Sequence, residues 1–279
     1  MSHEYSVNVL CATLAVSASG YHAWASRAPS RRAQANATLP PLIQQAHQAS
    51  RQTYGSPRIT RWLRDHGQTC GRVRVAKLMR QAAINRRPRR RFRPLSLTDS
   101  HHNLPVAPSR LLAQAQPVRP DAVWVADITY VETQEGFLYV AGILDRCSRR
   151  CVGWAMGDTL ATTLPLAALD MALTHRRPNG GLLHHSDQGV QYASRNYRQR
   201  LAEAGAVPSI SRRGNCYGNA AMESFWSSLK RELVHRQDFV SRAEARAAIF
   251  EWIEVFYNRT RLHSALGFKS PVDFENQIN

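Results

Sequence analysis

The spacing of hydrophobic positions changes near residue 120, and this change divides the chain into two parts. Before it, apolar residues recur at the three- and four-residue intervals of an amphipathic helix, as Ile59, Trp62 and Leu63 do. After it, runs rich in β-branched and aromatic residues alternate with helical stretches, beginning with VWVADITYVE at 123–132. We therefore expect a helical N-terminal part followed by an α/β part.

The N-terminal part predicts short helices separated by turns, over 7–16, after a cap at Ser17, over 42–49, and in a pair over 57–64 and 72–80. The basic residues of the pair lie mostly off its apolar stripes, as phosphate-contacting residues do in a helix-turn-helix. They are Arg58, Arg61, Arg64, Arg72, Arg74, Lys77 and Arg80. A plain helical hairpin with a solvated basic face is the alternative.

The segment after this pair predicts a linker. RRPRRRFRP at 86–94 combines helix-breaking prolines with mutually repelling arginines, and further prolines continue to Pro120. We expect a helical DNA-binding region over 1–85, a basic, proline-rich linker over 86–120, and a catalytic domain with a C-terminal helical extension over 121–279.

Within the last of these regions the pattern predicts a mixed α/β sheet. Three strands over 123–132, 136–145 and 151–156 form a meander with a turn at Gly136. Helices over 160–174, 194–204 and 220 to about 234 then alternate with short strands over 182–187 and 207–211. Strands separated by helices favour parallel neighbours with helices on the sheet faces.

Charge is distributed unevenly between the two parts. The chain carries a net charge of +17, of which residues 1–120 contribute +16 from 19 basic and three acidic residues. The remaining residues hold 18 basic and 17 acidic side chains. A basic block ahead of a nearly neutral one indicates a polyanion-binding module joined to a catalytic module. A solubilising surface is the alternative, although solubility needs a net charge of only about 2–8.

Composition excludes several classes of protein. No apolar stretch approaches the roughly 18–20 residues that span a bilayer. VNVLCATLAVSA at 7–18 resembles a signal-peptide core, but the preceding MSHEYS carries a Glu and no Lys or Arg, which argues against export. Five cysteines without a Cys-x-x-Cys pair indicate neither a disulfide framework nor a zinc finger. We expect a protein without membrane contact in the reducing cytoplasm, associated with the nucleoid.

Three acidic residues stand in settings that can converge. Asp127 lies within the first expected strand, Asp187 ends the fourth, and Glu223 lies on a helix after 35 intervening residues. If the two strands are adjacent, their carboxylates meet at the sheet edge where α/β sites collect. Converging carboxylates suit two Mg²⁺ ions, which can activate a water and stabilise a leaving oxygen in phosphodiester chemistry. Taken alone, each acid has an ordinary solvated alternative.

Other residues compete with or support this constellation. Asp145 ends the second strand and is a rival ligand, whereas His184 and His185 suit zinc or softer metals better than Mg²⁺. Lys230 lies seven residues after Glu223, nearly on the same helix face, where a cation can hold a phosphate beside the metals. Arg231 next to it is a further candidate DNA contact.

The C-terminal region predicts a helix with an apolar stripe at Ile249, Trp252, Ile253 and Phe256. YNRTRLH follows it, and we expect this segment to pack on the catalytic domain and to offer polar groups to DNA. These groups are Asn258, Arg259, Arg261 and His263. A structural helix end at Gly267 is an equal alternative.

At this point the chain resembles a known family, the transposases encoded by the second reading frame of bacterial insertion sequences of the insertion-sequence-three family. The resemblance runs through SGYHAW, YGSPRI, NLPVAP, VWVADITYV, FLYVAGILDRCSRRCVGWAM, HSDQGVQYAS, SRRGNCYGNAAMESFWSSLKREL and YNRTRLHSALGFKSPVDF. It covers nearly the whole chain.

This resemblance implies an RNase H-like catalytic domain, similar to retroviral integrase, with an Asp, Asp, Glu triad whose last two members are separated by 35 residues. Asp127, Asp187 and Glu223 match that triad, and Lys230 matches the basic residue one heptad after the Glu. Gly218 departs from the Asp that members usually carry, which leaves the entry to the Glu223 helix looser. In this family a first reading frame supplies a separate helix-turn-helix and a coiled coil, so the resemblance also implies a first-reading-frame partner or a frameshift fusion. No sustained heptad repeat is present in this chain.

We therefore expect a DNA strand transferase that uses Mg²⁺ or Mn²⁺, two ions per site, acts on double-stranded DNA as a homo-oligomer, and forms no covalent protein–DNA intermediate. A DNA-binding regulator of transposition that has lost catalysis is the first alternative. A ribonuclease of the same fold acting on RNA–DNA hybrids is the second, and the basic helical region disfavours it.

Overall fold

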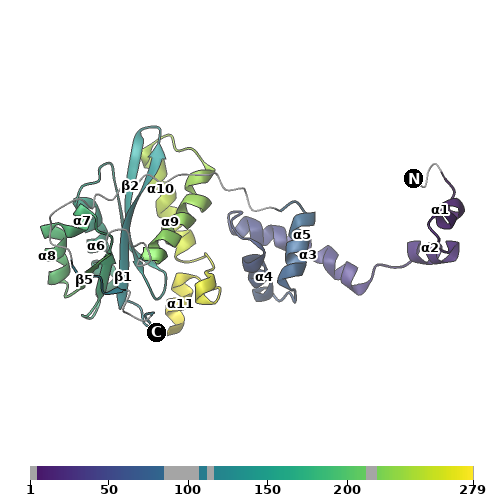
Figure 1. The fold of residues 1–279 in the computed structure, drawn as a ribbon, viewed down its shortest axis with the longest axis horizontal. Coiled ribbons are helices and arrows are strands. Elements are labelled where there is room, and N and C mark those ends of the chain that lie inside the picture. Colours follow the sequence, from purple (N-terminus) through teal and green to yellow (C-terminus); the bar gives the residue numbers. More distant parts are fainter. Residues whose placement is uncertain (1–4, 85–106, 112–115, 212–218, 279) are drawn as a thin grey trace. The chain divides into compact units, whose positions relative to one another are not determined.

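The computed structural model describes residues 5–84, 107–111, 116–211 and 219–278. Two compact units divide the chain, Met1–Arg86 and Arg87–Asn279. The first unit is helical and the second contains the sheet, in agreement with the change of pattern in the sequence (Figure 1).

Five helices form the described part of the first unit: α1 (Val7–Thr13), α2 (Ala18–Ala25), α3 (Arg31–Ala49), α4 (Ser56–Asp65) and α5 (Arg72–Gln81). A serine caps each of the first three, because its side chain accepts a hydrogen bond from the backbone N–H three residues later. The helix expected over 42–49 begins earlier in the structure, at Arg31, so the prediction covered only the second half of α3. Pro40 and Pro41 lie inside this helix and disfavour it locally. Burial of Leu39, Ile43 and Ala46 outweighs their helix-breaking tendency.

The helix pair α4 and α5 confirms most of the two predicted apolar stripes. Ile59 and Leu63 are buried in α4, as are Val75, Leu78 and Met79 in α5. Trp62 is the exception, because it is only half-buried and its ring stacks on His66 with centroids 3.7 Å apart.

The second unit is built on a five-stranded mixed sheet in the order β3-β2-β1-β4-β5. Its strands are β1 (Val123–Thr133), β2 (Gly136–Asp145), β3 (Cys151–Gly157), β4 (Leu183–Ser186) and β5 (Val207–Ile210). The first three form the predicted antiparallel meander, whereas β4 pairs in parallel with both β1 and β5. All five predicted strands are present, and the sheet is mixed as expected.

Helices cover both faces of this sheet: α6 (Thr163–Arg176), α7 (Val190–Ala193), α8 (Arg195–Glu203) and α9 (Ala220–Glu232). Two glycines show how close the covering is. A side chain at Gly153 would collide with the backbone of Ala168 in α6, and one at Gly142 would lie 2.8 Å from the Trp226 ring of α9. The core between the sheet and α6 includes Trp124, Ile143 and Leu169.

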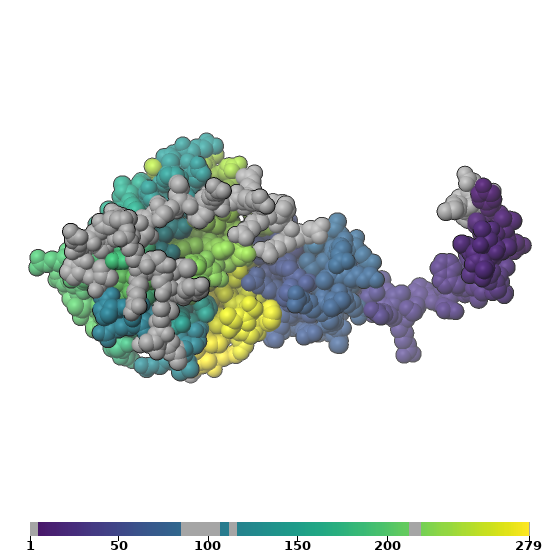
Figure 2. Space-filling view, viewed as in Figure 1, coloured from purple at the N-terminus to yellow at the C-terminus, as the bar shows by residue number. Residues whose placement is uncertain are grey.

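The C-terminal extension continues with η3 (Val234–Arg236), α10 (Arg242–Glu251), the π-helical η4 (Trp252–Tyr257), η5 (Ser264–Leu266) and α11 (Pro271–Ile278). The apolar stripe predicted here is buried, with Ile249, Trp252, Ile253 and Phe256 at most 2% exposed. Figure 2 shows the extension, in yellow and yellow-green, in one continuous surface with the teal strand region. The predicted packing of this segment on the catalytic domain is therefore present.

Part of the region expected to be a linker is anchored to the second unit. Leu111 is 2% exposed, and the backbone N–H of Arg110 donates to Ser209 Oγ at 2.9 Å. The basic run at 86–94 lies outside the described residues. Among the helices that the structure describes, none combines the length and apolar character required to cross a bilayer.

Candidate active site

Two of the three predicted acids meet at the same level of neighbouring strands. Val125 of β1 pairs with His185 of β4, so two residues further on Asp127 and Asp187 stand side by side where β4 ends. Both line one small cavity, whose wall consists of Asp127, Ile128, Leu160, Asp187, Gly189, Gln191 and Tyr192. The strand adjacency on which the sequence prediction depended is present.

Backbone N–H groups orient the two carboxylates. Asp127 Oδ1 accepts from the N–H of Ile128 at 2.8 Å, and Asp187 Oδ1 accepts from the N–H of Gly189 at 3.1 Å. A Cβ at position 189 would lie 3.1 Å from that same Asp187 oxygen. Glycine therefore leaves the space in which the carboxylate sits.

The pKa of Asp127 is raised to about 7. Burial is the largest cause, and the negative charge of Asp187 is the next, followed more weakly by that of Glu223. The hydrogen bond from the N–H of Ile128 opposes the shift. The three acids thus share one electrostatic environment.

Glu223 enters this environment from the first turn of α9, where it is exposed. Three side chains fix this helix. Trp226 packs on the sheet at Gly142, and Phe225 packs on Trp252 and Tyr257 of η4. The Asn219 Nδ2 donates to the Ala126 carbonyl at 3.3 Å. Within the described ranges, no three His, Cys, Asp or Glu side chains lie close enough together to enclose a metal ion. The structure therefore brings Asp127 and Asp187 together and leaves Glu223 at their border.

The groups around the cavity fit a hard divalent cation. Asp127 and Asp187 offer oxygen ligands, the kind that Mg²⁺ and Mn²⁺ bind. The Tyr192 hydroxyl in the same wall is buried and has no hydrogen-bond partner among the described residues. Burial, followed by the charges of Tyr197, Asp127 and Asp187, raises the pKa of Tyr192, so it stays a neutral donor.

The rival ligands have structural roles instead. Asp145 of β2 lies opposite Trp124, and Trp124 precedes Asp127 by three residues along β1. The Asp145 carboxylate accepts from the N–H groups of Asp121 and Ser148 at 2.7 Å each. It is fully buried and part of the turn that follows β2.

Both histidines of β4 are buried and neutral. His184 Nε2 meets the Tyr197 hydroxyl at 3.1 Å, and the two ring nitrogens of His185 meet the hydroxyls of Ser209 and Ser211 at 2.9 Å each. Burial lowers the pKa of His184 to about 3 and that of His185 to about 4. Their nitrogens are used within the core and are not directed at the acid pair.

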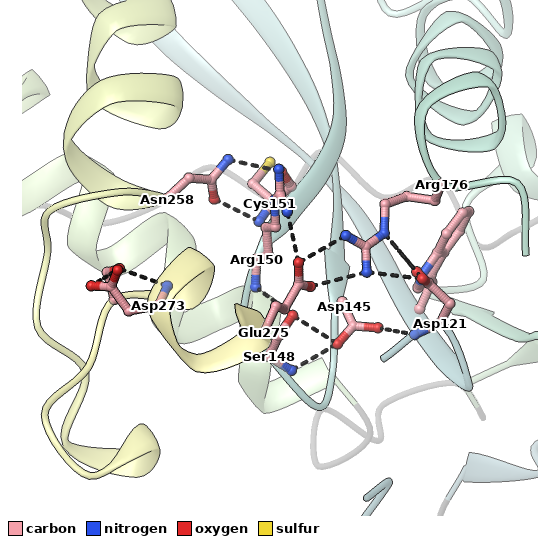
Figure 3. Close-up of polar contacts among 11 residues, drawn as sticks. Asp121, Asp145, Ser148, Arg150, Cys151, Arg176, Asn258, Asp273 and Glu275 are labelled. Atoms are coloured by element: carbon pink, nitrogen blue, oxygen red, sulfur yellow. Dashed lines mark hydrogen bonds and ion pairs between the residues drawn. The ribbon is translucent and has the colours of Figure 1, made fainter. Parts of the chain in front are cut away.

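A buried charge network at the other end of the sheet was not predicted from the sequence. Arg176 of α6 bridges Asp121 and Glu275 of α11, each at 2.8 Å, and Arg150 reaches the same Glu275 at 2.6 Å (Figure 3). Arg176 and Glu275 are 99 residues apart in sequence, so no local pattern connects them. The network attaches α11 to the sheet unit.

Lys230 and Arg231 have different local settings. Lys230 Nζ lies 4.8 Å from the centroid of the Tyr130 ring, and burial lowers the pKa of Lys230 while the charge of Asp127 opposes that shift. Arg231 Nε donates to the Ser227 carbonyl of its own helix at 2.9 Å. The charge of Asp127 therefore reaches Lys230.

The predicted DNA contacts of the first unit differ in availability. Arg72 and Lys77 are exposed, as is Arg61, which pairs with Asp65 at 2.9 Å. Arg58 lies over the Tyr54 ring at 5.4 Å and Arg74 Nε donates to Asn36 Oδ1 at 2.7 Å, so both are half-buried.

Three of the polar C-terminal residues expected to reach DNA, Asn258, Arg261 and His263, are instead buried, which favours a structural role for them. The Asn258 amide exchanges two hydrogen bonds of 3.0 Å with the backbone of Cys151. Arg261 forms a buried ion pair with Glu232 at 2.8 Å, and His263 packs edge-on against Tyr257 at 4.8 Å. Arg259 is exposed. The sequence pattern could not distinguish these roles, because the same polar groups serve internal hydrogen bonds and DNA contacts.

Comparison with family models places known domains on both units. Residues 33–92 match an HTH-like domain, and residues 117–216 and 223–278 match two models described as integrase core domain. In the first unit these ranges cover most of α3 and all of α4 and α5. In the second they cover the sheet, most of α9 and the C-terminal extension.

Curated relatives match almost end to end. The chain is 45% identical over 270 residues to the insertion element IS600 uncharacterized 31 kDa protein of Shigella sonnei, covering 97% of this chain and 98% of that protein. It is 37% identical over 276 residues to the transposase InsF for insertion sequence IS3A of Escherichia coli strain K12, covering 98% and 95%. Among solved structures, a chain of the simian T-cell lymphotropic virus intasome in complex with PP2A regulatory subunit B56 gamma aligns with a TM-score of 0.48 at 14% identity, covering 80% of this chain and 70% of that one.

Proposed function

Because this chain belongs to the IS3 family of insertion-sequence transposases and is a DNA transposase of the DDE type, we propose that it cuts and joins the ends of its element at the Asp127, Asp187 and Glu223 site. The observation that carries this proposal is the placement of Asp127 and Asp187 side by side at the end of β4, in one cavity. Glu223 on α9 supplies the third acid, and its charge already acts on Asp127.

We assign the metal ligands to these three acids. A pair of Mg²⁺ or Mn²⁺ ions bound there would supply Lewis acidity at the phosphodiester and a more acidic water nucleophile. The chain's own contribution begins with Asp127, which must lose its proton to serve as a ligand, and the positive charge of a cation would favour that loss. Ile128 and Gly189 N–H groups hold one oxygen of each aspartate, so the carboxylates are oriented in advance.

We propose that the freed 3′-OH of the element end then attacks a phosphodiester of the target in line. Each step exchanges one phosphorus–oxygen bond for another, so no net redox chemistry or covalent protein intermediate is required. The first unit, with its HTH-like match and its exposed Arg72 and Lys77, would hold the double-stranded DNA. Two element ends must be paired, so we propose a homo-oligomer on DNA in the cytoplasm, working with a first-reading-frame partner or as a fusion with it.

The test is Glu223→Gln in a cleavage and strand-transfer assay on duplex oligonucleotides that carry the terminal repeats, with Mg²⁺ or Mn²⁺. We expect loss of both reactions with DNA affinity nearly unchanged, because Gln keeps the size and removes the charge. Glu232→Gln is unsuitable as a control, since Glu232 pairs with buried Arg261. Glu203→Gln on α8 is suitable, because Glu203 is exposed.

Other outcomes would overturn the proposal. Substantial cleavage by Glu223→Gln would remove Glu223 from the site. DNA binding without cleavage by the unmodified chain, both alone and with its first-frame partner, would favour a regulator that has lost catalysis. Cleavage of RNA–DNA hybrids without end specificity would indicate a ribonuclease.

A further inference from the structure

The side chain of Lys230 is fixed by an aromatic ring beside the acid site. Lys230 lies on α9 seven residues after Glu223, and its Nζ is 4.8 Å from the centroid of the Tyr130 ring. Tyr130 belongs to β1, three residues after Asp127. Tyr130 and Asp127 therefore belong to one strand, and Lys230 and Glu223 belong to one helix.

The Tyr130 ring is itself held firmly. It is 5% exposed, it lies opposite Tyr139 of β2 in the strand register, and the edge of Phe137 meets it with centroids 5.0 Å apart. A ring packed in this way keeps its orientation, so its face is a stationary surface for a cation. Lysine otherwise has a long, flexible side chain whose ammonium samples many positions.

The position of the ammonium matters because of its neighbours. Asp127 is close enough that its charge acts on Lys230, and Lys230 is half-buried. A cation over an aromatic face at a partly desolvated site is favoured by a factor of about 5 to 30. The ring contact therefore selects, from the many lysine conformers, the one in which the charge lies beside the acids.

We propose that Tyr130 is a positioning residue, whose ring face holds the Lys230 ammonium next to Asp127 so that it contacts the DNA phosphate adjacent to the reacting one. This inference rests on the proposed function, since it assumes that DNA occupies the acid site. Tyr130 acts through Lys230 and need not touch DNA.

The test is a double-mutant cycle read out by DNA binding. Tyr130→Leu, Lys230→Ala and the double variant are compared with the unmodified full chain for affinity to a terminal-repeat duplex over a range of salt concentrations. We expect Tyr130→Leu and Lys230→Ala each to weaken binding about 3- to 10-fold. Both should reduce the salt slope, which is the slope of the logarithm of the binding constant against the logarithm of the salt concentration. The expected reduction in its magnitude is about 0.9, the value for one phosphate contact. The double variant should bind no more weakly than Lys230→Ala alone.

Two further variants separate the ring from other effects. Tyr130→Phe keeps the ring face and should bind within about twofold of the unmodified chain. Phe250→Leu is the control for loss of an aromatic ring, because Phe250 of α10 meets the Trp154 ring with centroids 5.7 Å apart and belongs to a different aromatic contact. It should leave the salt slope unchanged. If Tyr130→Leu does not fold, as judged by near-ultraviolet circular dichroism, Tyr130→Met replaces it.

Several results would overturn the inference. They are an unchanged slope in Tyr130→Leu, an effect that adds to that of Lys230→Ala, and an equal loss in Tyr130→Phe. Because the readout is binding, it is independent of the Glu223→Gln cleavage assay. Cleavage that survives Glu223→Gln would refute the proposed catalytic site, whereas loss of coupling between Tyr130 and Lys230 would refute only the positioning role.

Discussion

Asp127 combines a position suited to ligation with an unfavourable environment for its charge. The carboxyl is half-buried, faces Asp187, and has a pKa raised to about 7. At neutral pH the folded protein therefore holds a carboxylate that water would stabilise better in the unfolded chain. The ionised Asp127 therefore lowers the free energy of unfolding of the metal-free protein, and a bound cation would restore it.

This reasoning predicts that Asp127→Asn stabilises the metal-free protein. Asp127 titrates near its ordinary pKa when unfolded and near 7 when folded, so its destabilising effect begins as pH rises above about 4 and is complete above about 7. At pH 8 in EDTA, the free energy of unfolding should rise by about 1–3 kcal/mol, after allowance for solvent screening. Urea denaturation at pH 4.5 and pH 8 measures it.

The pH dependence is the decisive part of that experiment. The gain should be smaller at pH 4.5 than at pH 8, because at pH 4.5 the folded chain keeps the Asp127 proton and only the unfolded chain has begun to lose it. At pH 8 the gain should disappear when Mg²⁺ is added to the unmodified chain. An equal gain at both pH values would show that Asn improves packing and that the charge of Asp127 has no part in it.

At the scale of elements, the seat of α9 depends on Gly142 of β2. A Cβ there would lie 2.8 Å from the Trp226 ring and 3.3 Å from the Met222 methyl, both of which are buried under α9. Gly142→Ala should therefore push α9 outward, destabilise the protein by about 1–3 kcal/mol, and move Glu223 away from the aspartates.

For Gly142→Ala we expect strand transfer to fall about 10- to 100-fold, with DNA affinity retained, since a misplacement of about 1 Å has effects of that size. Gly71→Ala is the control, because Gly71 has an ordinary φ of −98° and open space around its Cβ position. Full activity in Gly142→Ala would mean that the sheet yields and that α9 keeps its place.

The attachment of α11 to the sheet unit depends on the ion pairs of Glu275 with Arg176 and Arg150. Burial alone would raise the pKa of Glu275, but hydrogen bonds from Arg176 and Arg150 outweigh it and hold the pKa below its usual range. Glu275→Gln should cost about 2–4 kcal/mol at pH 7, less than a fully broken buried pair, because Arg176 keeps Asp121.

A carboxylate with a lowered folded pKa stabilises the protein above its unfolded pKa, and this contribution is lost as pH falls through the folded value. The difference between Glu275→Gln and the unmodified chain should therefore shrink below about pH 4.5. Thermal unfolding from pH 3 to pH 7 tests this, with Glu203→Gln at an exposed pair as the control expected to change stability by less than about 1 kcal/mol. A difference independent of pH would exclude the charge of Glu275 as the cause.

Elements with strong local patterns could be predicted from the sequence, and those set by distant contacts could not. The β1 to β3 meander and the buried stripe of η4 follow from period-two and helical spacing that tertiary packing reinforces. The length of α3 was missed because Pro40 and Pro41 oppose a helix locally. The Arg176–Glu275 pair was missed because its partners are remote in the sequence.

At the scale of the whole molecule, charge predicted a division of labour that the family matches support. The basic first part matches an HTH-like domain, and the nearly neutral second part matches the integrase core. Composition could not show which basic side chains are exposed and can contact DNA, because the fold decides which of them are buried. Asn258, Arg261 and His263 have the side chains of DNA-binding residues, yet they are buried, and their contacts are with Cys151, Glu232 and Tyr257 of the same unit.

The exposed basic residues of α5 should therefore govern the salt dependence of DNA binding. Replacing Arg72 and Lys77 by alanine should weaken binding and reduce the salt slope by about 1.8, because two exposed phosphate contacts are lost. Replacing Arg74 should change the slope less, since its guanidinium is committed to Asn36. Replacing Arg200 and Arg246, which pair with acids in the second unit, removes the same formal charge and is the control. If the control flattens the slope as much as the α5 variant does, net charge alone drives binding, and the basic face of α4 and α5 is only a solvated surface.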